Sequence, residues 1–352
     1  MSPVLPNGFI MRPAAEPDLP QLAALDAAHT RHAVGAALRT ENEIRIEWKS
    51  PIFDPATDSQ VVCSPDGKIV GWCEIYDQAP HERIASRMRL SPDLGTNTES
   101  VASELIDWAV ARARASLAKA SPAARIALTQ GAYDGDPNAA FRLQKRGFEF
   151  IRCFLRMRIE MSEAPKAAVW PDGIEVRAFK KGQDDRPAVE AMIDVFRDHW
   201  GFVETSIEED LEEWKQWIYE DEDFDTDLWF LAIDDSTGDI AGFCQCYPFA
   251  GEDRMTGLVD ELGVRRAWRR GGLGTALLRH AFRAFYDRGV PNVELGVDSE
   301  SLTGATRLYE NAGMKLIWKN DVYELELRPA AESAREEDSR GVREEKPKAG
   351  TP

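Results

Sequence analysis

The stretch that decides the fold runs from Leu262 to Leu278 and reads LGVRRAWRRGGLGTALL. A strand is predicted to end at Val264 and a helix to begin near Gly274, because apolar residues then recur at helical spacing. A glycine-rich turn at a helix start directs several backbone N–H groups to one place, where the helix dipole also favours an anion. Arg269 and Arg270 add positive charge. The stretch therefore predicts a pyrophosphate-binding turn.

Two other glycine-rich phosphate motifs do not match. The chain has no Gly-x-x-x-x-Gly-Lys-Ser/Thr, and no Gly-x-Gly-x-x-Gly follows its first strand. The pattern Arg269-x-x-Gly272-x-Gly274 instead resembles the acyl-CoA signature of the GNAT superfamily of N-acetyltransferases. Downstream, ATRLYENAGM (residues 305–314) resembles the second signature of that family. The resemblance covers residues 173–328.

The resemblance implies where acetyl-CoA, the acyl donor, would bind. The strand before the turn and its neighbour would splay apart, with the pantetheine arm in the gap and the pyrophosphate on the amides of the turn. Ser301 stands where the family usually has Asn, and it can still offer one hydrogen bond. The residues so assigned are Leu262, Gly263, Val264, Arg269, Arg270, Gly271, Gly272, Leu273, Gly274, Thr275 and Ser301.

Acetyl transfer to an amine requires a neutral nitrogen. For a lysine-like amine at pH 7, deprotonation costs roughly 4.6 kcal/mol, so a carboxylate is expected to accept the proton. Asp260 and Glu261, next to the expected acyl position, are the candidate bases. Alternation along the strand predicts that they point to opposite faces, so that at most one faces the acceptor. By resemblance, Tyr309 would donate to the leaving thiolate through a hydrogen bond that strengthens as charge develops on sulfur.

An internal repeat indicates a tandem duplication. GFIMR (8–12) matches GIEVR (173–177), GKIVGWCEIY (67–76) matches GDIAGFCQCY (238–247), and AFRL (140–143) matches ATRL (305–308). The matches occur in one order, at offsets of 165 to 171 residues. We expect an α+β fold with two tandem GNAT-like domains, each a mixed, mostly antiparallel sheet flanked by helices. The domains are predicted at 8–161 and 173–328, followed by a disordered tail at 329–352.

The first domain is predicted to be degenerate. Its matching turn, LSPDLGTNTES (90–100), has one glycine, no arginine and two acidic residues, and Gln144 stands where the second domain has Tyr309. Both differences fall on the cofactor side. The arrangement is similar to that of tandem members of the family in which the C-terminal domain transfers the acetyl group.

Composition limits the classes of partner. The 352 residues include 43 basic and 61 acidic ones, and the net charge of −18 argues against nucleic acid. No apolar run is long enough to cross a bilayer, and the first residues lack the features of a secretory signal. Five cysteines without paired spacing fit a reducing cytoplasm. We expect a cytoplasmic protein, monomeric or homodimeric, with no membrane, nucleic-acid or metal partner.

The resulting prediction is an acyltransferase (acyl groups other than aminoacyl) that moves acetyl from acetyl-CoA to a small amine. Residues 204–227 contain twelve acidic residues and one Lys, and a cationic acceptor would be attracted there. Two alternatives remain open: a non-catalytic protein that binds or senses acyl-CoA, and a protein N-acetyltransferase.

Overall fold

The computed structural model describes residues 5–331, apart from 198, 203–205 and 302–303. Residues 332–352, most of the predicted tail, lie outside the described part. The elements of the first half are β1 (Ile10–Pro13), α1 (Leu19–Val34), α2 (Glu41–Trp48), α3 (Pro55–Asp58), β2 (Ser59–Cys63), β3 (Ile69–Tyr76), β4 (Arg83–Leu90), α4 (Thr98–Ala115), β5 (Ile126–Tyr133), α5 (Ala139–Gln144) and β6 (Glu149–Glu160).

The second half repeats this order apart from the one-turn helix α3, as the internal repeat predicts. Its elements are β7 (Ile174–Ala178), α6 (Asp185–Phe196), α7 (Ile207–Glu220), β8 (Trp229–Asp234), β9 (Ile240–Tyr247), β10 (Thr256–Val264), α8 (Leu273–Asp287), β11 (Asn292–Asp298), α9 (Ala305–Asn311) and β12 (Lys315–Arg328). The matched segments at 67–76 and 238–247 contain β3 and β9, which form the antiparallel pairs β2–β3 and β8–β9.

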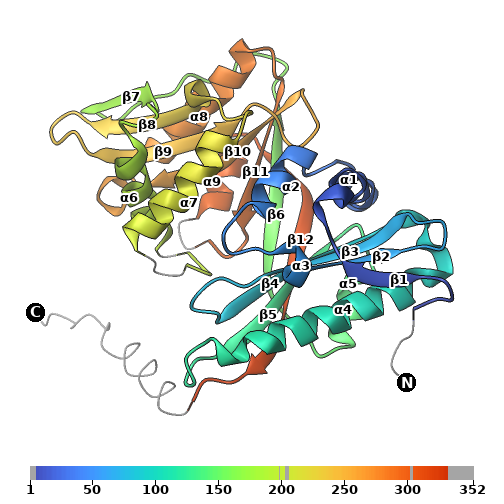
Figure 1. Cartoon of the computed structure of the whole chain (residues 1–352). Coiled ribbons are helices and arrows are strands. Elements are labelled where there is room, and N and C mark those ends of the chain that lie inside the picture. Colours follow the sequence, from blue (N-terminus) through green and yellow to red (C-terminus); the bar gives the residue numbers. More distant parts are fainter. Residues whose placement is uncertain (1–4, 198, 203–205, 302–303, 332–352) are drawn as a thin grey trace, which may run out of the picture.

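One feature of the sheet was not predicted: all twelve strands form a single sheet, and the halves exchange their last strands. The order is β1-β2-β3-β4-β5-β12-β6-β11-β10-β9-β8-β7. Thus β12, from the second half, pairs with β5 of the first half, and β6 pairs with β11 of the second. Figure 1 shows β6 and β12 running together through the middle of the molecule.

The apolar residues of the exchanged strands explain why each one packs where it does. On β6, Met157 is buried among the residues of α8 and β9–β11, in the core of the second half. On β12, Tyr323 and Leu327 are buried against α4 and β3–β5, in the core of the first half. Alternating apolar residues on each long strand therefore complete the core of the other half.

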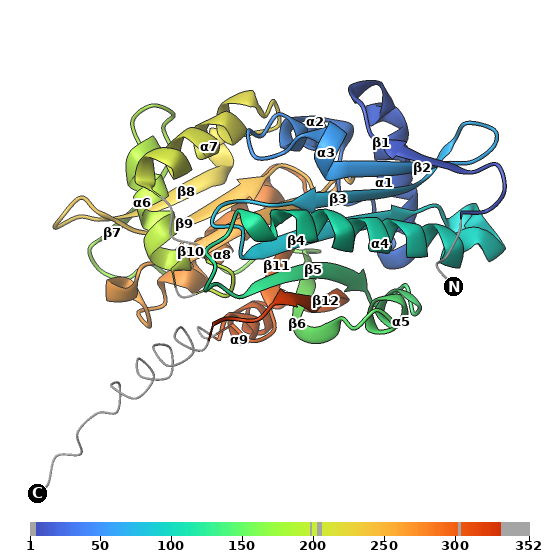
Figure 2. The same ribbon diagram turned by 60° about the horizontal axis from the view of Figure 1, so that its bottom comes forward.

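Helices cover both faces of the sheet (Figure 2). The helices α4 and α8 pack on the cores just described. On the opposite face, α1 and α2 cover β1–β3, and α6 and α7 cover β8 and β9.

Candidate active site

The glycine-rich turn has the backbone geometry of an anion-binding site. Arg270 and Gly272 both adopt positive φ, of 69° and 88°, and α8 begins at Leu273. The backbone N–H groups of residues 270–275 have no hydrogen-bond partner within the described part of the chain. A Cβ added at Gly272 would meet no atom within 4 Å, so a ligand can approach the main chain there. Six unused amides at a helix N-terminus fit a pyrophosphate.

Next to this turn, two parallel strands separate and leave a slot. Strands β10 and β11 pair only between residues 256–259 and 292–295. Beyond this point β10 pairs only with β9, and β11 only with β6. The edge of β10 from Asp260 to Val264 is therefore free toward β11, which is the opening that the resemblance predicts for a pantetheine arm.

Glycine at position 263 is required by close packing. A Cβ there would lie 2.7 Å from side-chain atoms of both Phe243 and Val195. Its neighbours Leu262 and Val264 pack on the opposite face, against the core under α8. At Gly274 an added Cβ would come within 3.3 Å of Leu308 on α9, so this glycine lets α8 lie close to the helix that carries Tyr309.

The structure places ten of the eleven predicted acetyl-CoA residues along one continuous strand, turn and helix start, 262–264 and 269–275. Arg269 has a role that the sequence did not reveal: its Nε donates to the carbonyl of Val264 at 2.9 Å, which fixes the turn to the end of β10. Ser301 lies in the turn after β11, where its N–H donates to the carbonyl of Asp298. Its predicted contact with acetyl-CoA stays a prediction.

The prediction that Asp260 and Glu261 point to opposite faces is wrong. The register of β10 against β9 shifts between Val259, opposite Cys246, and Glu261, opposite Gln245, so that Asp260 is the extra residue of a β-bulge. A bulge interrupts the strict alternation of side chains. The face of the strand on which Asp260 lies therefore no longer follows from its being next to Glu261 in sequence.

Glu261 has the environment of a proton acceptor. Burial, together with the nearby charge of Asp260, raises the pKa of Glu261 from 4.5 to about 8. Its Oε2 is buried and has no hydrogen-bond partner within the described part of the chain. The side chain alternates with Leu262, so it points away from the α8 core and toward the face that carries α6 and α7. A carboxylate titrating near neutrality in such a place is suited to general base catalysis.

Asp260 differs from Glu261 in its surroundings. It keeps contact with solvent, although protein atoms crowd it from several sides. Burial raises its pKa, and the positive charge of Arg156 opposes that rise. Arg156 comes from the exchanged strand β6 and pairs with Glu294 at 2.7 Å. The first half of the chain therefore contributes a charged residue beside the candidate bases, which local sequence patterns could not indicate.

Tyr309 lies on the other side of the slot. It is 6% exposed and belongs to the core beneath α8. Burial, and to a lesser extent the nearby Cys244, raise its pKa well above the usual value for tyrosine. Within the described residues its hydroxyl has no hydrogen-bond partner, so it remains free to donate. Glu261 and Tyr309 thus flank the slot from opposite faces of the sheet.

The corresponding place in the first half is filled by ion pairs. On β4, Arg87 lies opposite Glu74 of β3, and it is the counterpart of Glu261, which lies opposite Gln245 of β9. The pairing of β3 with β4 has no bulge. Arg87 and Arg39 bind Glu47 at 2.9 and 2.6 Å. The matching turn forms a 3-10 helix at residues 92–97. The first half therefore has neither the carboxylate nor the glycine-rich turn of the second.

Other features of the described residues complete the picture. Cys244 and Cys246 are buried, and their sulfurs lie 3.6 Å apart. The described residues contain no cluster of three or more His, Cys, Asp or Glu side chains arranged to hold a metal ion. Among the described helices, none has the length and apolar character needed to cross a membrane.

Comparison with known proteins agrees with this geometry. Residues 189–314 match the model of the acetyltransferase (GNAT) family. The mycothiol acetyltransferase of Thermobifida fusca is 27% identical over 282 residues, which are 74% of this chain and 80% of that protein. That of Thermobispora bispora is 33% identical over 192 residues, 53% of this chain and 62% of that protein.

Solved structures cover nearly the whole chain. A GCN5-related N-acetyltransferase from Sphaerobacter thermophilus has a TM-score of 0.75 and 27% identity, and covers 93% of this chain and 98% of its own. A tandem GNAT protein from the clavulanic acid biosynthesis pathway, with a TM-score of 0.66 and 17% identity, covers 92% of this chain and 100% of its own, and shares the fold. Residues 189–314 therefore match the GNAT family of acetyltransferases, and the chain shares the fold of a tandem GNAT protein.

Proposed function

We propose that the second half of the chain transfers the acetyl group of acetyl-CoA directly to a primary amine. The observation that carries this proposal is the buried, unpartnered carboxylate oxygen of Glu261 beside the open edge of β10. The unused amides of the turn support binding of the donor. The division into units at 8–161 and 173–328 stays part of this proposal, and the exchange of β6 and β12 makes each unit depend on the other.

The chemistry follows from the two sides of the slot. Glu261 accepts a proton from the amine, whose nitrogen then forms a bond to the acetyl carbon. As the tetrahedral intermediate collapses, the nitrogen releases its second proton to solvent, the carbon–sulfur bond breaks, and the Tyr309 hydroxyl donates a hydrogen bond to the departing thiolate. Since a phenol is a weaker acid than a thiol, this hydrogen bond stabilises the thiolate rather than fully protonating it.

The acceptor of the relatives gives a starting point. They are named mycothiol acetyltransferases, so amines related to mycothiol belong in the first set to be tested. Release of free CoA thiol from acetyl-CoA, followed over a panel of amines, amino acids and aminosugars, tests the proposal. Tight acetyl-CoA binding without thiol release with any of these amines would favour the binding or sensing alternative. Acetylated peptides formed only with this protein would favour the protein N-acetyltransferase.

Replacing Tyr309 with Phe is expected to lower kcat by about 10- to 100-fold, because one hydrogen bond to a developing charge is lost. The KM for acetyl-CoA should stay nearly unchanged, since the turn is not touched. Thiol release measures both values. Tyr323→Phe, at a buried tyrosine in the core of the first half, is the matched control. An unchanged kcat in Tyr309→Phe would remove this residue from the mechanism.

Replacing Asp260 with Asn is expected to shift the pH profile. The charge of Asp260 raises the pKa of Glu261, so the neutral amide should lower that pKa by about one unit. A base works only when deprotonated, and the rising acidic limb of kcat/KM should therefore move to lower pH. A limb that stays in place or moves to higher pH would contradict the coupling of the two carboxylates.

A further inference from the structure

We propose that Arg152 of β6 is a positioning residue for acetyl transfer, which holds both walls of the slot between β10 and β11. On the donor side it fixes the turn after β11 that carries Ser301. On the acceptor side it fixes the segment after α6 that carries Trp200. This inference rests on the proposed function and adds a residue of the first half to it. The argument depends on the contacts of one guanidinium group with elements on two sides of the slot.

The residues that Arg152 joins share the face of the sheet to which Glu261, the proposed base, points. On β11, Val297 is buried in the core under α8, so its neighbour Asp298 faces away from that core. Phe154 of β6 lies directly opposite Asp298 in antiparallel register and therefore shares its face. Arg152, two residues from Phe154, belongs to the same face. The acceptor must approach the slot on this side.

The donor wall depends on Asp298, where β11 ends. One Nη atom of Arg152 donates to the Asp298 carboxylate, and the other forms an ion pair of 3.3 Å with Glu300. The second carboxylate oxygen of Asp298 accepts from the N–H of Glu300 at 2.9 Å, and its carbonyl accepts from the N–H of Ser301 at 3.1 Å. Gly304, the N-cap of α9, donates to the carbonyl of Ser301 at 3.2 Å. Arg152 therefore anchors the turn that carries Ser301 and leads into α9.

The acceptor wall depends on Trp200, in the segment between α6 and α7. The guanidinium carbon of Arg152 lies 5.1 Å from the centre of the Trp200 ring. The guanidinium carbon of Arg83, at the start of β4, lies 5.2 Å from the same centre, and the ring of Phe154 lies at 6.4 Å. A cation over an indole ring is attracted by its electron-rich face. Three side chains of the first half thus hold one tryptophan of the second.

The segment that carries Trp200 begins beside the open edge of β10. At Gly263 on this edge, an added Cβ would lie 2.7 Å from a side-chain atom of Val195, in the last turn of α6. The next residue, Phe196, packs against Phe243 of β9 with ring centres 6.2 Å apart. From there the chain runs to Trp200 over β6. It therefore crosses the slot on the face of the proposed base.

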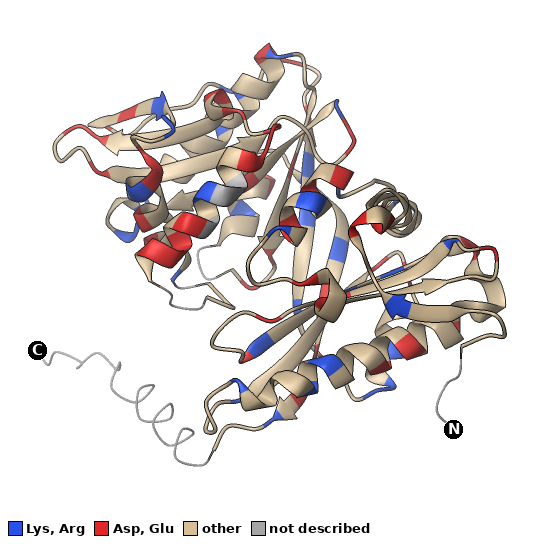
Figure 3. Ribbon diagram, in the orientation of Figure 1, with Lys and Arg blue, Asp and Glu red and all other residues tan. Residues whose placement is uncertain are grey.

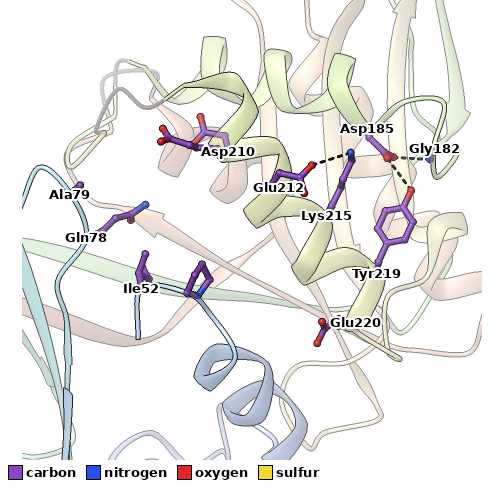
Figure 4. Close-up of a pocket in the computed structure, with 12 residues that line it drawn as sticks. Ile52, Gln78, Ala79, Gly182, Asp185, Asp210, Glu212, Lys215, Tyr219 and Glu220 are labelled. Carbon is purple, nitrogen blue, oxygen red and sulfur yellow. Dashed lines mark hydrogen bonds and ion pairs between the residues drawn. The ribbon is translucent and has the colours of Figure 1, made fainter. Parts of the chain in front are cut away.

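Beyond Trp200, an open groove lies between α7 and the first half (Figure 4). Its volume is about 1060 Å³, and its lining includes Ile52 and Gln78 of the first half and residues of α7. An ion pair of 2.8 Å between Lys49 and Glu220 joins the first half to the end of α7. The first half therefore positions this segment through contacts at its two ends, and Trp200 is at the end next to the slot.

An arginine suits this place because its planar group can serve both walls at once. Its edge binds carboxylates and its face packs on an aromatic ring, whereas a lysine is a point charge. Figure 3 shows basic residues along the central strands, where β6 also carries Arg156 and Arg158. Arg158 pairs with Glu294, at a level where β10 and β11 are still paired. It lies away from the open part of the slot and provides a matched control.

The test measures KM for each substrate in the thiol-release assay, with the full chain and an amine that it acetylates. In Arg152→Gln we expect KM for acetyl-CoA and KM for the amine each to rise at least about fivefold. A merely structural role would reduce the folded fraction, which lowers kcat and leaves both KM values unchanged. Arg158→Gln should change neither KM, because Glu294 keeps its ion pair of 2.7 Å with Arg156.

Arg83→Gln separates the two walls. Arg83 contacts the Trp200 ring, and within the described residues it has no ion pair with the turn after β11. We expect KM for the amine to rise at least about threefold, while KM for acetyl-CoA stays unchanged. Since Arg83 is exposed, this variant should fold even if Arg152→Gln does not.

The outcomes distinguish this inference from the proposed function. A rise in only one KM in Arg152→Gln, or unchanged KM values in either variant, would overturn the inference and leave the proposed function intact. A rise in KM for acetyl-CoA in Arg83→Gln would also contradict it, because the two walls would then not be held separately. Absence of thiol release by the unaltered chain with every amine of the panel would overturn the proposed function, and this inference with it.

Discussion

Replacing Glu261 with Gln is expected to lower kcat/KM for acetyl transfer by about 10²- to 10⁴-fold, the range for loss of a general base. The amide is nearly the same size but cannot accept a proton. In the unaltered chain, kcat/KM should rise with pH through the pKa of Glu261, about 8, because only the carboxylate form is active. In the variant this rise of kcat/KM with pH should vanish. The remaining pH dependence of kcat/KM should come only from deprotonation of the free amine.

Three measurements make this result specific. Acetyl-CoA affinity should stay the same, since the turn at 270–275 does not include Glu261. Glu175→Gln, at an exposed residue of β7, should leave the rate unchanged. Asp260→Asn should move the limb without removing it. A large loss in Asp260→Asn together with a small loss in Glu261→Gln would assign the base to Asp260 instead.

Local patterns were sufficient to predict the elements that hold the site. The helix expected near Gly274 begins at Leu273, and the strand expected to end at Val264 does so. Both boundaries depend on residues close in sequence: apolar spacing for the helix, and glycines that permit the turn. The resemblance added the separation of β10 from β11, which the pairing bears out.

Features that depend on distant partners could not be read from the sequence. The bulge at Asp260 exists only relative to β9, so the strand pattern alone gave the wrong facing for Asp260 and Glu261. The alternating residues of β6 would suit either half, because alternation specifies a buried face but not which strand lies alongside. For this reason the sequence did not indicate that Arg156 would stand beside the candidate bases.

The second half produced alone, as residues 173–331, is expected to lose acetyl-CoA binding and turnover, although it contains every predicted site residue. It lacks β6. Residues 296–298 of β11 lie beyond the part that pairs with β10. There β11 is paired only with residues 154–156 of β6. Without β6, one wall of the slot would lose its neighbour, and the core would lose Met157, whose burial contributes roughly 1.5–3 kcal/mol.

Co-production with residues 1–172 should restore binding and turnover, because the second fragment then regains β6 and the first regains β12. Thermal unfolding and titration with acetyl-CoA measure the effect, and the uncut chain ending at Ala331 is the control, since it keeps every described element. Full activity in the isolated second half would show that β11 holds its position without the exchanged strand. Restoration by the first fragment would instead show that the first half is needed to form the catalytic slot. It would do so by supplying β6, although it has neither the glycine-rich turn nor a counterpart of the Glu261 carboxylate.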